Sequence, residues 1–145
     1  MEPNSRLAIF KSFIGQPMTN GPSGVGRWLG GVLRVVEEGR LVADYVVTEQ
    51  HLNPMQTLHG GTVAAIMDDL CGLTVFALGR EYGYTSVNMN VDFLSAARLG
   101  ETLTTEAVVV RAGRNIVHVE GRITNATGKL IAKCSTNLIQ TTVKM

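Results

Sequence analysis

One stretch near the middle of the chain limits the folds that this sequence can adopt. Residues 53–78 begin with turn-forming residues, Pro54 and the pair Gly60-Gly61, and continue as a long segment that is apolar on nearly every side. An amphipathic surface helix carries a single apolar stripe, whereas a helix that is apolar all round is buried. The sequence therefore predicts a buried central helix that the rest of the chain must cover.

Two carboxylates, Asp68 and Asp69, interrupt this apolar segment. A charge in a buried position is costly unless it is paired or used in function. We therefore interpret Asp68 as the strongest pointer to function in the sequence. Adjacent helical residues point about 100° apart, so Asp69 faces other neighbours, either as a salt-bridge partner or as a competing catalytic candidate.

The remaining segments predict an antiparallel sheet. Six runs alternate or are rich in β-formers, at residues 32–36, 41–48, 84–93, 102–111, 115–124 and 129–143. In the third run, alternation places Val87 and Met89 on one face and Ser86 on the other. Consecutive strands joined by short turns are antiparallel neighbours. The predicted fold class is α+β, with a curved antiparallel sheet wrapped around the long central helix.

The last two strands each show an inward-facing set. Alternation predicts that these residues face the core: Val117, Val119, Gly121, Ile123, Leu130, Ala132, Cys134 and Leu138. Ahead of the sheet, residues 5–14 have helical spacing with Ser5 as a candidate cap. Residues 19–31 are rich in glycine but lack the known phosphate-binding patterns, so we expect a loop there.

Length and composition fit a single domain over residues 1–145, with an N-terminal helix and loop over residues 1–30. The net charge of +1, without long charged runs, argues against a nucleic-acid or membrane partner. Cys71 and Cys134 lie in apolar contexts, which indicates buried free thiols in a reducing compartment. No run approaches the length of a membrane span, and no spacing suggests a metal site. We expect a cytoplasmic protein.

The spacing of two candidate residues couples the site to the assembly. His59 precedes the helix and Asp68 lies nine positions later, a separation of about 13 Å along a helix. Within one subunit these two side chains cannot act on the same bond. If both are catalytic, two helices packed antiparallel about a two-fold axis must supply them. The sequence thus predicts a homodimer with the site at its interface, itself paired into a tetramer.

The helix start and Asp68 together suggest a type of chemistry. The backbone N–H groups of Gly60 and Gly61 lie in the first turn, where donors are unsatisfied and the dipole is positive. Such a donor stabilises a developing oxyanion by about 3 kcal/mol. Asp68 can serve as general base for water or attack a carbonyl itself, and Asn53 and Ser86 can orient the water or the carbonyl. These parts describe acyl transfer to water.

The same residues carry a family resemblance. Asn53, His59-Gly60-Gly61, Asp68 and Ser86 resemble the pattern of hotdog-fold acyl-CoA thioesterases, in the branch of the phenylacetic-acid-pathway enzymes and thioesterase superfamily member 2. The likeness covers about residues 51–138. It implies hydrolysis of an aromatic or medium-chain acyl-CoA to the free acid and CoA, with the CoA thioester as substrate and no further cofactor.

The resemblance also implies roles for individual residues. The Gly60 N–H and Asn53 polarise the thioester carbonyl, and His59 positions the substrate and the loop. Asp68 from the opposite subunit is the nucleophile or general base, and Ser86 holds the water. Further substrate contacts are expected from the second glycine and from cations near the turns, as candidates for the CoA phosphates: Gly61, Arg80, Arg111, Arg114 and Lys129.

Other interpretations of the same residues remain open. Asn53 can be a turn residue, His59 a helix-entry residue and Ser86 an ordinary strand serine, while His51 and His118 are structural or solvated. A non-catalytic acyl-CoA-binding module is the main alternative function, although the presence of both Asp68 and Ser86 favours the enzyme. A hotdog hydratase or dehydratase requires a histidine after the acid, and here the histidine comes first.

Overall fold

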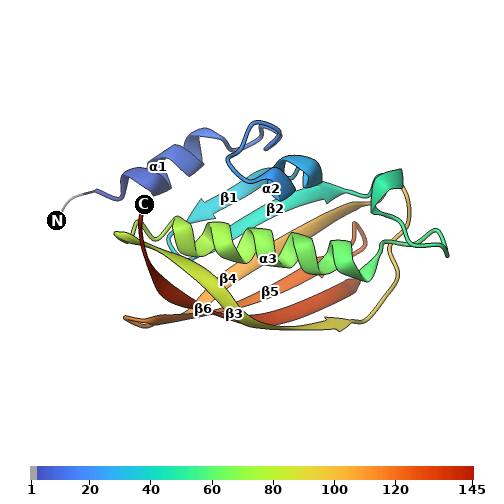
Figure 1. The fold of residues 1–145 in the computed structure, drawn as a ribbon. Coiled ribbons are helices and arrows are strands. Elements are labelled where there is room, and N and C mark those ends of the chain that lie inside the picture. The colour runs from blue at the N-terminus through green and yellow to red at the C-terminus, as the bar shows by residue number, and fades with distance from the viewer. Residues whose placement is uncertain (1–2) are drawn as a thin grey trace.

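The computed structural model describes residues 3–145 and contains one antiparallel sheet with a helix across it (Figure 1). The helices are α1 (Ser5–Ser12), α2 (Gly24–Leu29) and α3 (Gly60–Phe76), with a 3-10 turn at Glu49–His51. The strands are β1 (Val32–Glu37), β2 (Arg40–Val46), β3 (Tyr82–Phe93), β4 (Thr102–Ala112), β5 (Ile116–Thr124) and β6 (Leu130–Lys144). Their order in the sheet is β1-β2-β4-β5-β6-β3. The expected α+β hotdog class is confirmed.

Helix α3 lies across the concave face of the sheet (Figure 1). Its buried residues form one broad face: Thr62, Val63, Ile66, Met67, Leu70, Cys71, Thr74 and Val75. The sheet covers this face only, and Gly61 and Asp68 on the other side are exposed. The expectation of a helix enclosed on all sides, with Asp68 buried, is wrong for the single chain. The apolar side chains of α3 face the sheet on one side of the helix and an open cavity on another.

The short helices correct two local predictions. Residues 24–29 form α2 rather than a loop, because Ser23 accepts a hydrogen bond from the Gly26 N–H and Gly30 closes the helix at φ 64°. Helix α1 is confirmed, but its N-cap is Asn4, whose side chain accepts from the Leu7 N–H at 3.1 Å. The Asn4 amide also donates to the Ala77 carbonyl at 2.8 Å, so α1 caps the C-terminal end of α3.

A β-bulge decides which way Ser86 points. Ser86 pairs with Leu138, whereas Asn88 pairs with Asn137, so Val87 is an extra residue in β3. Such an insertion interrupts the alternation of faces. Ser86 therefore shares the face of buried Leu138 and points toward α3 with Met89, although strict alternation predicted opposite faces.

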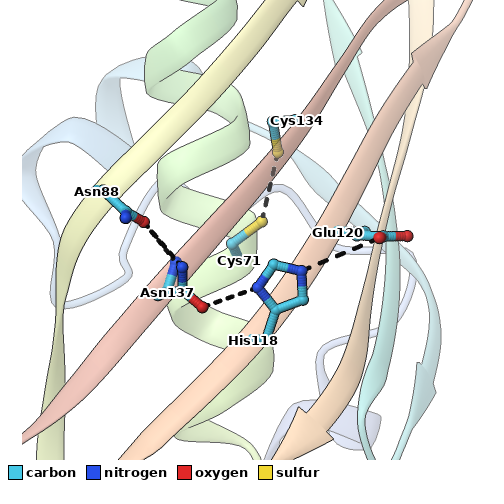
Figure 2. A network of polar contacts seen from close by, with 6 residues as sticks. All are labelled: Cys71, Asn88, His118, Glu120, Cys134 and Asn137. Atoms are coloured by element: carbon cyan, nitrogen blue, oxygen red, sulfur yellow. Dashed lines mark hydrogen bonds and ion pairs between the residues drawn. The ribbon is translucent and has the colours of Figure 1, made fainter.

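The core between sheet and helix follows the predicted pattern except at Leu130, which is only partly buried, because the β5–β6 register shifts there and Ile131 is buried instead. Val117, Val119 and Ile123 are fully buried. The free thiols of Cys71 and Cys134 are also buried, with their sulfur atoms 4.0 Å apart, and join α3 to β6 (Figure 2). Within residues 3–145, no helix is both long enough and apolar enough to cross a membrane.

Candidate active site

The central contact of the site joins α3 to β3. The Ser86 hydroxyl donates to Oδ1 of Asp68 at 2.9 Å, and both side chains are exposed. Because the bulge turns Ser86 toward the helix, two residues that are 18 apart in sequence meet here. The second oxygen of Asp68 accepts no hydrogen bond from the described residues. A carboxylate held at one oxygen and open at the other is suited to take a proton or attack a carbon.

Asp68 opens onto a cavity of about 410 Å³ beside α3. Its walls come from one face of α3, from the first residues of β3 and from the end of β6. The main wall residues are Leu73, Phe76, Tyr82, Tyr84, Thr141 and Val143. The volume lies within the range of small-molecule sites, and the apolar walls suit an acyl group.

The start of α3 offers a single free donor. His59 is the N-cap, and its Nδ1 atom accepts the Gly61 N–H at 2.8 Å. The Gly60 N–H has no hydrogen-bond acceptor in the described chain, whereas Gly61, expected to contact substrate, already donates to His59. A side chain at position 60 would lie 3.3 Å from the Phe93 ring, so the glycine keeps the space between the helix start and this ring open. Because Nδ1 of His59 accepts, its neutral ring carries the proton on Nε2.

The loop before α3 is held by internal hydrogen bonds. Oδ1 of Asn53 accepts the N–H groups of Met55 and Thr57 at 3.0 and 3.1 Å, and its amide donates to Thr57 Oγ1 at 2.9 Å. Asn53 thus stabilises the turn before α3, and one N–H of its side-chain amide remains for a substrate. Buried His51 accepts the His59 N–H through its carbonyl at 2.8 Å, and burial lowers its pKa. We therefore regard His51 as a structural brace.

Asp69 faces α2 instead of Ser86. Oδ2 of Asp69 is buried without a hydrogen-bond partner, and a side chain at Gly26 would lie 3.3 Å from both carboxylate oxygens. Burial raises the pKa of the Asp69 carboxyl, with the Ser23 side chain opposing the shift. No cation of residues 3–145 lies within 4.0 Å of it, so the structure gives no support for a salt bridge. Of the two acids, only Asp68 contacts Ser86.

The four expected phosphate-binding cations do not gather in one place. Arg80 donates to the Tyr84 hydroxyl at 2.7 Å and to the Ala112 carbonyl at 3.1 Å, which commits it to the β4–β5 turn. Arg114 lies in that turn, and Lys129 lies in the β5–β6 turn at the opposite end of β5. Arg111 pairs with His118, which places it on the outer face of the sheet.

That outer face carries a row of polar residues. Figure 2 shows Asn88, Asn137 and His118 joined across three strands, with contacts of 3.0 Å between the first two and 2.8 Å between the last two. Glu120 lies 4.0 Å from the His118 ring. Because Val117 and Val119 face the core, His118 points away from α3 and from Asp68. His118 therefore remains a structural residue.

Among the cavity residues that the sequence did not indicate is a cation, Arg6. Arg6 reaches the cavity from α1, 70 positions before its contact on α3. An arginine early in a short amphipathic helix gives no local signal of such a role. Only the docking of α1 on the end of α3 reveals it.

The comparisons with known proteins identify the family of this chain. A profile described as Thioesterase superfamily matches residues 55–132. The human protein named acyl-coenzyme A thioesterase 13 is 35% identical over 96 residues, which cover 66% of this chain and 69% of that protein.

Two solved structures are also similar. A phenylacetic acid degradation-related protein of Ralstonia eutropha JMP134 is 34% identical, with a TM-score of 0.75 over 84% of this chain and 96% of that one. A Streptococcus pneumoniae TIGR4 thioesterase solved with coenzyme A is 25% identical, with a TM-score of 0.73 over 77% and 85%. With a profile match over more than half of its length and this human relative, the chain belongs to the thioesterase superfamily.

Proposed function

We propose that this protein hydrolyses an acyl-CoA to the free acid and CoA. The observation that carries the proposal is the hydrogen bond from Ser86 to Asp68 beside an apolar cavity. Family membership supports thioester hydrolysis, and the pneumococcal relative was solved in complex with coenzyme A. The acyl group that suits the cavity is aromatic or of medium length.

The reaction uses the carboxylate of Asp68 and one backbone N–H donor. As general base, Asp68 takes a proton from a water held by Ser86, and the water oxygen attacks the thioester carbonyl carbon. The resulting oxyanion accepts the free Gly60 N–H. The C–S bond then breaks, and the CoA thiolate leaves and takes up a proton. In the nucleophilic variant Asp68 attacks first, and water hydrolyses the mixed anhydride.

These groups act together only across a dimer. Gly60 and Asp68 are eight positions apart on α3, a separation of about 12 Å. The strand β3 supports association because it is a twelve-residue edge strand that pairs with β6 on one side only. Unpaired edges of this length bind other strands. We propose a homodimer in which Gly60, Asn53 and His59 of one subunit serve Asp68 and Ser86 of the other.

The test is a panel assay of thiol release. Aliphatic and aromatic acyl-CoAs of increasing size are compared, with Asp68→Asn as the inactive control. We expect turnover of at least one class and a loss of turnover in the variant. Binding of acyl-CoA without thiol release would instead identify a non-catalytic module. Equal hydrolysis of simple thioesters that lack the nucleotide would show that nucleotide contacts are unnecessary.

A further inference from the structure

Gly72 lies in the middle of α3, where glycine is unfavourable because it destabilises the interior of a helix relative to alanine. Two reasons usually require glycine: a backbone angle that other residues rarely adopt, or a neighbour that leaves no room for a side chain. Within residues 3–145, five glycines have no atom within 4 Å of the position that a side-chain Cβ would take: Gly15, Gly30, Gly72, Gly100 and Gly128. The other four have positive φ angles of 64 to 85°, whereas Gly72 has a helical backbone. Neither reason therefore explains Gly72.

The space beside Gly72 belongs to the cavity at the candidate active site. Gly72 lines this cavity, as do Asp68 four positions earlier and Phe76 four positions later. Residues four apart lie on the same face of a helix, so Gly72 lies between Asp68 and Phe76 along one wall. A side chain at position 72 would take up cavity space without meeting the rest of the chain. The volume that the glycine leaves free is thus available to a ligand.

We infer that an unbranched, medium-length acyl chain runs along α3 and passes over Gly72, with its thioester beside Asp68 and its end near Phe76. This inference rests on the proposed thioester hydrolysis. The apolar side chains of Leu73, Phe76 and Val143 suit the methylene groups of such a chain. Gly72 is then a specificity-determining residue, because any side chain at this position narrows the path beyond it. It takes no part in the chemical step.

The geometry of α3 sets the length of acyl chain that Gly72 affects. Four helical residues span about 6 Å, and eight span about 12 Å. An extended chain advances about 1.2 Å per bond, as in a polypeptide backbone. About five bonds therefore separate the thioester from the level of Gly72, and about ten separate it from Phe76. A butyryl group ends before Gly72, whereas an octanoyl group passes it.

The experiment compares butyryl-CoA with octanoyl-CoA in the parent protein, Gly72→Ala and Gly72→Leu. For the parent we expect the higher kcat/KM with octanoyl-CoA. In Gly72→Leu the ratio of octanoyl- to butyryl-CoA kcat/KM should fall at least about 10-fold, the smallest effect typical of one methylene in an apolar pocket. Gly72→Ala should lower the ratio less. Its Tm should rise, because alanine forms helices better and its methyl group would meet no protein atom within 4 Å.

Two controls separate the cavity from general effects of added bulk. Ala8→Leu adds an apolar side chain at an exposed position of α1 and should leave the ratio unchanged. Light scattering should find the same oligomeric state for the parent and for both Gly72 variants. If Gly72→Leu fails to fold, Gly72→Ala decides by the same ratio and by its Tm.

The outcomes distinguish this inference from the function on which it rests. Hydrolysis of octanoyl-CoA with a ratio that Gly72 variants leave unchanged, or hydrolysis only of other acyl-CoAs of the panel, would overturn the inference and leave the thioesterase in place. A lower Tm in Gly72→Ala, or a changed oligomeric state, would show that protein occupies this space and would also overturn it. Failure to hydrolyse any acyl-CoA of the panel would remove both. A ratio that falls as the side chain grows, beside a raised Tm in Gly72→Ala, supports both.

Discussion

At the scale of single residues, the two adjacent acids have different surroundings. Asp68 receives the Ser86 hydroxyl and faces the cavity, whereas Asp69 is turned toward α2 with a buried, unpartnered oxygen. Their Asn variants are matched, because each change is nearly isosteric and removes one charge at neighbouring positions of the same helix.

We predict that only Asp68→Asn abolishes turnover. Loss of a general base costs about 100- to 10,000-fold in rate, while Asp69→Asn should retain most of the parent turnover number. Circular dichroism and thermal melting establish that both variants are folded. Near-normal turnover in Asp68→Asn beside a folded but inactive Asp69→Asn would move the catalytic role by one residue.

A second prediction concerns pH and stability at Asp69. Burial raises the pKa of its carboxyl above the unfolded value, so the folded state favours the protonated form. Stability from such a group is complete below the unfolded pKa and is lost as pH rises through the folded pKa. Asp69→Asn lacks this loss, so its Tm should exceed that of the parent by a margin that grows from acid to neutral pH. A margin that stays constant with pH would contradict the assignment.

At the scale of elements, α3 depends on an unusual cap. The His59 ring accepts the Gly61 N–H, which leaves the Gly60 N–H as the donor for an oxyanion. We predict that His59→Ala lowers the free energy of unfolding by about 0.5–2 kcal/mol, the range for loss of an N-cap. His59→Asn should restore stability, because Asn is among the best N-cap residues.

The same pair of variants tests the imidazole. Chemical denaturation measures the stability that the N-cap contributes. The value of kcat/KM measures the contribution of the Nε2–H group, which we expect to position the substrate. We expect His59→Asn to regain stability while its kcat/KM remains low. Full activity in His59→Asn would reduce the role of His59 to capping alone.

A further prediction concerns the packing of α3 on β5. A side chain at Gly121 would lie 2.8 Å from the Cys134 sulfur and 3.0 Å from the Met67 sulfur. Gly121→Ala should therefore lower the free energy of unfolding by about 1–3 kcal/mol, as overpacking does. Adding Cys134→Ala makes room, so the double variant should lose less than the sum of the single losses. Urea denaturation measures all four proteins, and strictly additive losses would argue against this contact.

The elements also show what the sequence could predict. Alternation and turn residues located all six strands, and apolar composition located α3, because these signals are local. The bulge at Val87 depends on pairing with β6, a strand distant in sequence, and α2 depends on a Ser23 cap and on packing against Asp69. The exposure of Asp68 depends on which side of α3 the sheet covers. The family resemblance predicts roles for Asp68 and Ser86 in one site, whereas the strand pattern alone turns Ser86 to the face opposite Met89.

At the scale of the whole molecule, the proposed site needs two chains. We predict that the active species is a dimer or larger, and that light scattering finds no active monomer at assay concentration. Mixing inactive Asp68→Ala subunits with His59→Ala subunits should restore one working site per mixed dimer, provided that His59→Ala alone is inactive. No recovery after verified subunit exchange would mean that both residues of one site come from the same subunit.

The bulge in β3 has a consequence for how this molecule can change during evolution. Ser86 meets Asp68 because one additional residue, Val87, shifts the strand relative to β6. The contact thus depends on the number of residues in β3 as well as on which side chains the strand carries. Replacing Val87 by another residue should preserve it, whereas deleting Val87 should rotate the preceding part of the strand and turn Ser86 outward. A descendant can therefore lose the site through a single-codon deletion that leaves both of its polar residues in the gene.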